Sequence, residues 1–197
     1  MRGAPDKAVS PALLSATADT LRRSGPRQFS LTAVAEAAGV SRGTVHNALG
    51  SRDNAMRAAL DHLASAFIDT MADEVQKADT LADQVAAAAV LVCAHRQRSD
   101  SVLARGINES ILVLLLGNIG DDLMQRAVAL WSPLVRKAQD RGEVESTRDA
   151  AQASEWILRM LLSFELVPPI GVNLDSPRAV RRFVRDYIVD GLGGAAR

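Results

Sequence analysis

The stretch Ser30 to Leu49, SLTAVAEAAGVSRGTVHNAL, is the part of the sequence that decides the fold. Its first half carries apolar residues at the three- and four-residue spacing of a short helix, and Val34 lies at the centre of that stripe. Gly39 follows and permits a left-handed or closely packed turn that a larger residue resists. A second short helix then begins, with Val45 on its inward side. The stretch therefore predicts two short helices joined by a tight turn.

The two predicted helices also carry signals at their ends. Ser30 and Ser41 are N-cap residues, and Gly50 follows the second helix as a terminator. With Val45 and Leu49 directed inward, the remaining residues of the second helix are left for its other faces. These residues are Arg42, Gly43, Thr44, His46 and Asn47.

The composition predicts an all-α fold. The chain has 197 residues, of which 48% are hydrophobic and 23% charged, as in soluble globular proteins. Aromatic residues make up only 4%, and helix formers outnumber the residues from which strands are built. Hydrophobic spacing predicts helices over 10–25, 30–38, 41–49, 52–77, 80–97, 99–116, 121–141, 147–166 and 176–191, with breaks at 117–120 and 168–171.

These helices divide into a small N-terminal head and a larger body. The first three form a trihelical unit, and the fourth is long enough to leave it and enter the next part of the chain. No linker rich in proline, glycine or serine separates the two parts, so we place the boundary inside the fourth helix. The predicted domains are residues 1–60 and residues 61–197.

Charge and cysteine content narrow the class of protein. Residues 1–60 contain eight basic and four acidic side chains, whereas the remainder contains 15 basic and 19 acidic ones. A basic head is expected if that end alone meets polyphosphate, although chance gives the same asymmetry. The single cysteine, Cys93, and the absence of an apolar signal segment favour a reducing cytoplasm. The longest apolar run, 111–116, is too short to span a bilayer.

The run FSLTAVAEAAGVSRGTVHNALGSRDNA resembles the signature of the TetR family of bacterial transcriptional repressors. The strongest matching points are 34–35, 38–41, 43–44 and 51–53, and the resemblance covers about residues 10–60. Four positions depart from the family pattern. The family usually has tyrosine, then tyrosine or histidine, then phenylalanine where this chain has His46, Ala48 and Leu49, and it usually has lysine at the position of Arg52.

A helix-turn-helix lays its second helix in the major groove, which assigns roles to the exposed residues. Arg42 is suited to guanine, Asn47 to adenine and Thr44 to a thymine methyl group. Gly43 permits close approach of the backbone, and the cap at Ser41 presents amides to a phosphate. We expect Thr32, His46 and Arg52 to anchor the DNA backbone. The alternative is that these side chains are merely solvated.

The resemblance also implies a homodimer, because a single head contacts few base pairs. The last two long helices carry wide apolar faces that fit a four-helix bundle between two copies. The candidate interface residues are Trp156, Met160, Phe164, Phe183 and Tyr187. In the alternative interpretation these positions are the ordinary core of a monomer.

The central helices predict a pocket for a small, lipophilic effector. Its candidate lining is Phe67, Met71, Ile107, Ile111, Leu115, Met124, Val128 and Trp131, beside Cys93. Pro133 should kink its helix near this region. The sparse polar residues His95, Asn108 and Glu109 are suited to orient a ligand. For any one apolar residue, an ordinary core position is the stronger alternative.

The sequence contains no motif for catalysis or for binding a metal ion. The three histidines lack metal-ligand spacing, and no phosphate loop, nucleophile elbow or zinc-protease motif is present, so no cofactor and no catalysis are expected. The sequence therefore predicts a dimeric, ligand-responsive repressor that binds a palindromic operator. The alternative is a helical ligand-binding or partner-binding protein that has lost specific DNA recognition.

Overall fold

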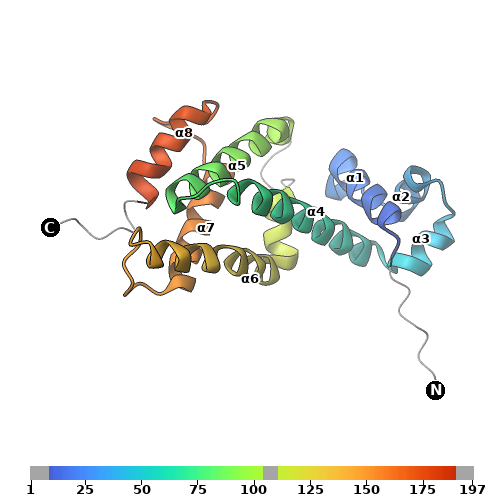
Figure 1. Cartoon of the computed structure of the whole chain (residues 1–197). Coiled ribbons are helices and arrows are strands. Elements are labelled where there is room, and N and C mark those ends of the chain that lie inside the picture. Colours follow the sequence, from blue (N-terminus) through green and yellow to red (C-terminus); the bar gives the residue numbers. More distant parts are fainter. Residues whose placement is uncertain (1–8, 104–110, 190–197) are drawn as a thin grey trace, which may run out of the picture. The chain divides into compact units, whose positions relative to one another are not determined.

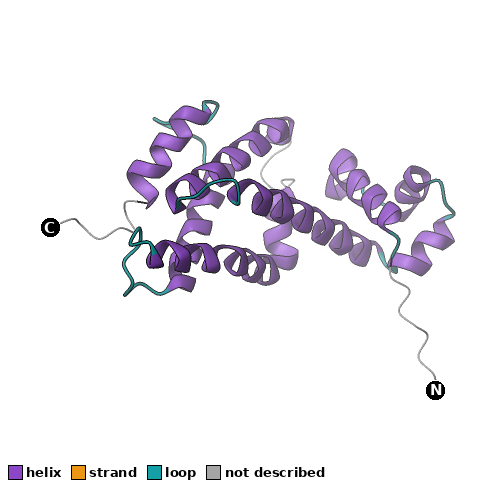
Figure 2. Ribbon diagram, in the orientation of Figure 1, coloured by secondary structure: helices purple, strands orange, loops and turns teal. Residues whose placement is uncertain are grey.

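The computed structural model describes residues 9–103 and 111–189, and this part of the chain consists of helices and their connections (Figures 1 and 2). The all-α fold predicted from composition is confirmed. The helices are α1 (Pro11–Gln28), α2 (Leu31–Ala38), α3 (Arg42–Leu49), α4 (Arg52–Val75), α5 (Leu81–Leu103), α6 (Ile111–Asp140), α7 (Ala150–Leu166), α8 (Pro177–Val184) and the π-helix η2 (Arg185–Val189). None of these described helices is both long and apolar enough to cross a membrane.

The chain forms two compact units, which we call the head and the body. The head comprises the described residues within 1–66 and 105–120, and the body comprises those within 67–104 and 121–197. Helix α4 passes from one unit to the other between Ala66 and Phe67, and α6 does so between Gly120 and Asp121. Sequence analysis placed one boundary near residue 60; the structure has a second crossing, because the first part of α6 belongs to the head.

The head is built around one apolar cluster that its helices share. Leu21, Val34, Val45 and Leu60, one from each of the first four helices, are fully buried there. The first three turns of α6 add partly buried residues to the same cluster, namely Ile111, Leu114, Leu115 and Ile119. Burial of these side chains stabilises α2 and α3, which at eight residues each are too short to be stable in isolation.

Two helices continue where the sequence predicted an end. In α1 the backbone leaves helical torsion angles at Gly25 (φ 68°, ψ 173°) and resumes with Pro26, whose missing N–H is harmless at the start of a helical segment. In α6 the predicted break at 117–120 is reduced to one non-helical residue, Ile119 (φ −137°, ψ 24°). Pro133 lies inside α6, but the departure from helical torsion angles occurs at Ile119.

The body has its own apolar cluster, centred on Trp131 of α6. Helix α5 packs against α7 and α8, and the fully buried side chains of this cluster come from α4, α5, α6, α7 and α8. They include Val85, Trp131, Ile157, Leu161, Val180 and Val184. The large buried residues show that the body folds as a unit with a dense core.

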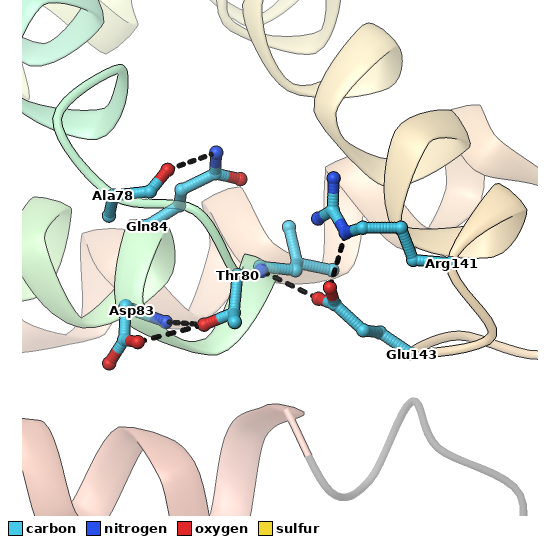
Figure 3. A network of polar contacts seen from close by, with 7 residues as sticks. Ala78, Thr80, Asp83, Gln84, Arg141 and Glu143 are labelled. Carbon is cyan, nitrogen blue, oxygen red and sulfur yellow. Dashed lines mark hydrogen bonds and ion pairs between the residues drawn. The ribbon is translucent and has the colours of Figure 1, made fainter.

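A polar network fixes two turns of the body (Figure 3). Glu143, after α6, accepts a hydrogen bond of 2.8 Å from the backbone N–H of Leu81, which begins α5. Arg141 donates to the other carboxylate oxygen of Glu143. The hydrogen bond from Arg141, followed by that from Leu81, holds the pKa of Glu143 below its ordinary value. The acidic side chain therefore caps a helix that lies far away in the sequence.

Candidate nucleic-acid interface

The turn between α2 and α3 is a Schellman motif at Gly39. The Gly39 N–H donates to the carbonyl of Glu36 (3.3 Å), and the Val40 N–H donates to the carbonyl of Ala35 (3.0 Å). Gly39 has a φ of 65° and a ψ of 31°, the left-handed conformation that this motif requires. The glycine turn predicted from the sequence is therefore present, and its backbone is left-handed.

Both helices of the pair are N-capped by the serines identified from sequence. The Ser30 hydroxyl accepts a hydrogen bond from the Ala33 N–H at 3.2 Å, and the Ser41 hydroxyl accepts one from the Thr44 N–H at 3.0 Å. The Thr44 hydroxyl lies 2.9 Å from that of Ser41. These bonds fix the start of α3, where a recognition helix presents its side chains to base edges.

Helix α3 is divided into a buried and an exposed face. Val45 is fully buried and Leu49 is 6% exposed, so both anchor the helix in the head. The residues predicted to contact DNA all lie on the exposed surface of the free protein, namely Thr32, Ser41, Arg42, Gly43, Thr44, His46, Asn47 and Arg52. Six of these eight are on α3 or its N-cap, so the structure brings most of the predicted site together.

Gly43 lies in α3 with an ordinary helical backbone, and no internal contact requires a glycine there. A Cβ added to Gly43 would meet only the Ser41 hydroxyl within 4 Å, at 3.6 Å, which is a normal van der Waals distance. A glycine in a helix interior lowers helix stability relative to alanine. The head therefore carries, in the first turn of α3, an exposed glycine that its own packing does not explain.

Arg52, predicted as a phosphate anchor, has contacts within the head that sequence analysis missed. Its Nε donates to the carbonyl of Phe29 at 2.9 Å, and a terminal nitrogen donates to the carbonyl of Pro26. It also lies 3.4 Å from the carboxylate of its neighbour Asp53. Every residue has a backbone carbonyl, so no sequence pattern distinguishes the carbonyls of Phe29 and Pro26 as partners of Arg52.

The residues predicted to line an effector pocket are distributed over both units. Phe67, Met71 and Trp131 share the body core, and Met124 and Val128 are half-buried on α6. Ile111 and Leu115 instead pack against the core of the head. Ile107, Asn108 and Glu109 lie outside the described residues.

The body core contains polar groups beside the predicted lining. The His95 ring contacts Phe67 edge to face, with centroids 5.4 Å apart, and His95 Nδ1 lies 3.5 Å from a Glu165 carboxylate oxygen. The indole N–H of the fully buried Trp131 has no hydrogen-bond partner in the part of the chain that the structure describes. Burial raises the pKa of the Cys93 thiol to about 11, which keeps it protonated.

The five candidate dimer residues differ in exposure. Phe164 is buried within its own chain, and Met160 and Phe183 are half-buried. Trp156 is 41% exposed and Tyr187 70% exposed, so each offers an aromatic side chain to a partner. Three of the aromatic rings form a row. The ring centroid of Phe183 lies 6.1 Å from that of Phe164 and 5.1 Å from that of Tyr187.

Solved structures share this arrangement of a helix-turn-helix head and a helical body. The repressor AlkX from Dietzia sp. has 22% identity and a TM-score of 0.60, covering 93% of this chain and 95% of its own. A cysteine variant of the regulator CifR, complexed with a 26-base-pair operator, has 19% identity and a TM-score of 0.61, covering 94% and 99%. This is the fold of TetR-family regulators.

The TetR-like fold extends over the body as well as the head. The regulator FadR from Bacillus subtilis, in complex with stearoyl-CoA, has 13% identity and a TM-score of 0.61, covering 88% of this chain and 96% of its own. No family model matches the sequence, and no curated protein matches it. The likeness to TetR-family regulators, first indicated by the helix-turn-helix signature, thus concerns the three-dimensional structure of the whole chain.

The two glycines of the helix-turn-helix should respond in opposite ways to alanine. Gly39→Ala should lower the free energy of unfolding by about 1–2 kcal/mol, because an L-residue is strained in the left-handed conformation. Gly43→Ala should leave it unchanged or raise it by up to about 1 kcal/mol, because alanine is the better helix former. Urea unfolding followed by circular dichroism measures both, and equal effects would contradict the different backbone roles of the two glycines.

Proposed function

We propose that this protein is a ligand-responsive transcriptional repressor that binds a palindromic operator as a homodimer. The observation that carries the proposal is the exposed face of α3. The helix is N-capped and packed against the head core, and it presents Arg42, Thr44 and Asn47 at the surface. Gly43 lies among them, and internal packing does not require a glycine at that position. The TetR-like fold supports the same function, and a regulator of this kind works in the cytoplasm with the chromosome.

In this proposal α3 enters the major groove of the operator. Arg42 donates two hydrogen bonds to a guanine, Asn47 pairs with an adenine edge, and the Thr44 methyl group contacts thymine. Gly43 lets the helix backbone approach the DNA, which accounts for its presence at an open position. Thr32, Ser41 and His46 contact the phosphate backbone and set the orientation of the helix.

The DNA-binding proposal is tested by replacing residues on the exposed face of α3. Arg42→Ala should weaken binding to the operator by about 1–3 kcal/mol and relax the preference at one base pair, and Gly43→Ala should weaken binding without loss of stability. Binding is measured by fluorescence anisotropy over a salt series, on DNA enriched by the protein from a random-sequence library.

Arg136→Ala is the matched control for Arg42→Ala, because Arg136 is an exposed arginine of the body. Specific binding should fall steeply with salt for the unchanged protein. Failure to enrich any sequence would instead favour the alternative function, a helical ligand-binding or partner-binding protein without specific DNA recognition.

We further propose that the effector is a small lipophilic molecule held in the body near Phe67, Met71 and Trp131. These side chains supply apolar surface, while the Trp131 N–H and His95 supply polar groups for orientation. The stearoyl-CoA bound by a protein of the same fold supports a lipophilic ligand. An effector releases DNA only if it binds more tightly to a conformation that does not fit the operator.

Stearoyl-CoA and n-hexadecane are suitable first probes of the effector site. At about 100 times its dissociation constant, a true effector should add about 2.7 kcal/mol of stability and raise the melting temperature by several degrees. Phe67→Ala should abolish this ligand-induced shift, and Leu134→Ala, a control at the edge of the same core, should retain it. A melting temperature that neither probe changes would argue against a long-chain effector.

The proposed dimer interface uses the exposed aromatic residues of α7 and η2. Tyr187→Arg should convert the dimer to a monomer, because it places a charge in the centre of an apolar contact. Gln76→Arg, an exposed change elsewhere in the body, should leave the dimer intact. Analytical ultracentrifugation distinguishes the two states, and a dimer that persists in Tyr187→Arg would place the interface elsewhere.

A further inference from the structure

The contacts of Arg52 within the head point to a role other than phosphate binding. Arg52 is the first residue of α4, and its guanidinium reaches back to the last turn of α1 and the residue that follows it. There it donates to two carbonyls, that of Phe29 at 2.9 Å and that of Pro26. This segment is 23 to 26 residues away in sequence, so the contact ties together two parts of the head.

The two carbonyls lie where backbone acceptors are least satisfied. The last carbonyls of a helix have no partner within it, and they form the negative end of the helix dipole. Pro26 follows the non-helical residue Gly25 in the last turn of α1, and Phe29 is the C-cap residue of that helix. A guanidinium satisfies such a site well, because it is cationic and its donors have a fixed planar geometry.

The same segment positions the helix-turn-helix. The Phe29 side chain is 2% exposed and forms part of the head core, and the next residue, Ser30, caps α2. By holding the carbonyl of Phe29, Arg52 therefore holds the start of α2 against the first turn of α4. The link joins two helices that do not follow one another in the chain.

The start of α4 is also fixed on the side of α3. The Gly50 N–H donates to the His46 carbonyl at 2.8 Å, which closes α3, and the Ser51 hydroxyl accepts from the Asn54 N–H at 3.2 Å, which caps α4. Only residues 50 and 51 separate the two helices. The first turn of α4 is thus connected to α3 through the chain and to α2 through Arg52.

We propose that Arg52 is a positioning residue that locks the α2–α3 pair to the first turn of α4, so that α4 and the recognition helix move together. This inference deepens the proposed DNA-binding function and replaces the phosphate contact expected from sequence. The ion pair with Asp53 does not explain the placement of Arg52, because the Asp53 side chain is 84% exposed and pairs with such exposed partners contribute little. The side chain is selected for its fork of donors rather than for its charge alone.

Arg52→Lys distinguishes a positioning role from a phosphate contact. Lysine keeps the positive charge but lacks the planar fork of donors. Hydrogen exchange of the whole purified protein, read by mass spectrometry, reports the lock without DNA. Exchange of the amides in residues 27–38 should accelerate about tenfold in Arg52→Lys, as expected for loss of hydrogen bonds from a charged donor. Arg57→Lys, an exposed arginine of the same helix, is the control and should exchange as the unchanged protein does. Unchanged exchange in Arg52→Lys would overturn the proposal.

DNA binding supplies the second measurement, on the operator sequence enriched from the random library. A positioning role predicts that Arg52→Lys weakens specific binding about tenfold, and that Arg52→Gln leaves the salt slope unchanged. A phosphate contact predicts near-normal affinity for Arg52→Lys and a slope reduced by about one in Arg52→Gln, and this result would overturn the proposal. If the unchanged protein binds no DNA, the proposed function fails, while the exchange measurement still decides whether the lock exists.

Discussion

The head depends on burial of apolar side chains from helices that are too short to be stable alone. Helices α2 and α3 have eight residues each, below the length at which an isolated helix persists in water. Val34 and Val45, both fully buried, hold them in the head core, and the left-handed turn at Gly39 sets their mutual orientation. Tertiary packing therefore stabilises α3 and holds its exposed face in place.

Helix α4 is a continuous helix with residues in both the head and the body. Its first residue, Arg52, is bonded to the end of α1, Leu60 is fully buried in the head core, and Met71 and Val75 are buried in the body core. A single helix with buried residues in both units transmits strain more directly than a flexible linker does. In the proposed function, this continuous helix is the covalent route by which an effector in the body affects α3.

The body shows why an apolar pattern alone does not define a pocket. Phe67, Met71 and Trp131 appear in the sequence as residues of one kind with Ile111 and Leu115, yet the structure assigns the last two to the head core. Helical spacing reports which face of a helix is buried, and it does not report against which neighbour. The buried, unpartnered indole N–H of Trp131 in the described structure is the feature that now distinguishes one part of this core from the rest.

The sequence by itself determined the all-α class, the two serine caps, the left-handed glycine and the exposed set on α3, because each of these follows from local spacing and backbone preference. Only the tertiary structure decided the partners of Arg52, the addition of the first turns of α6 to the head, and the capping of α5 by Glu143. The contacts of Arg52 and Glu143 reach backbone groups, which leave no pattern in the sequence, and the apolar spacing of α6 does not report which core its side chains join.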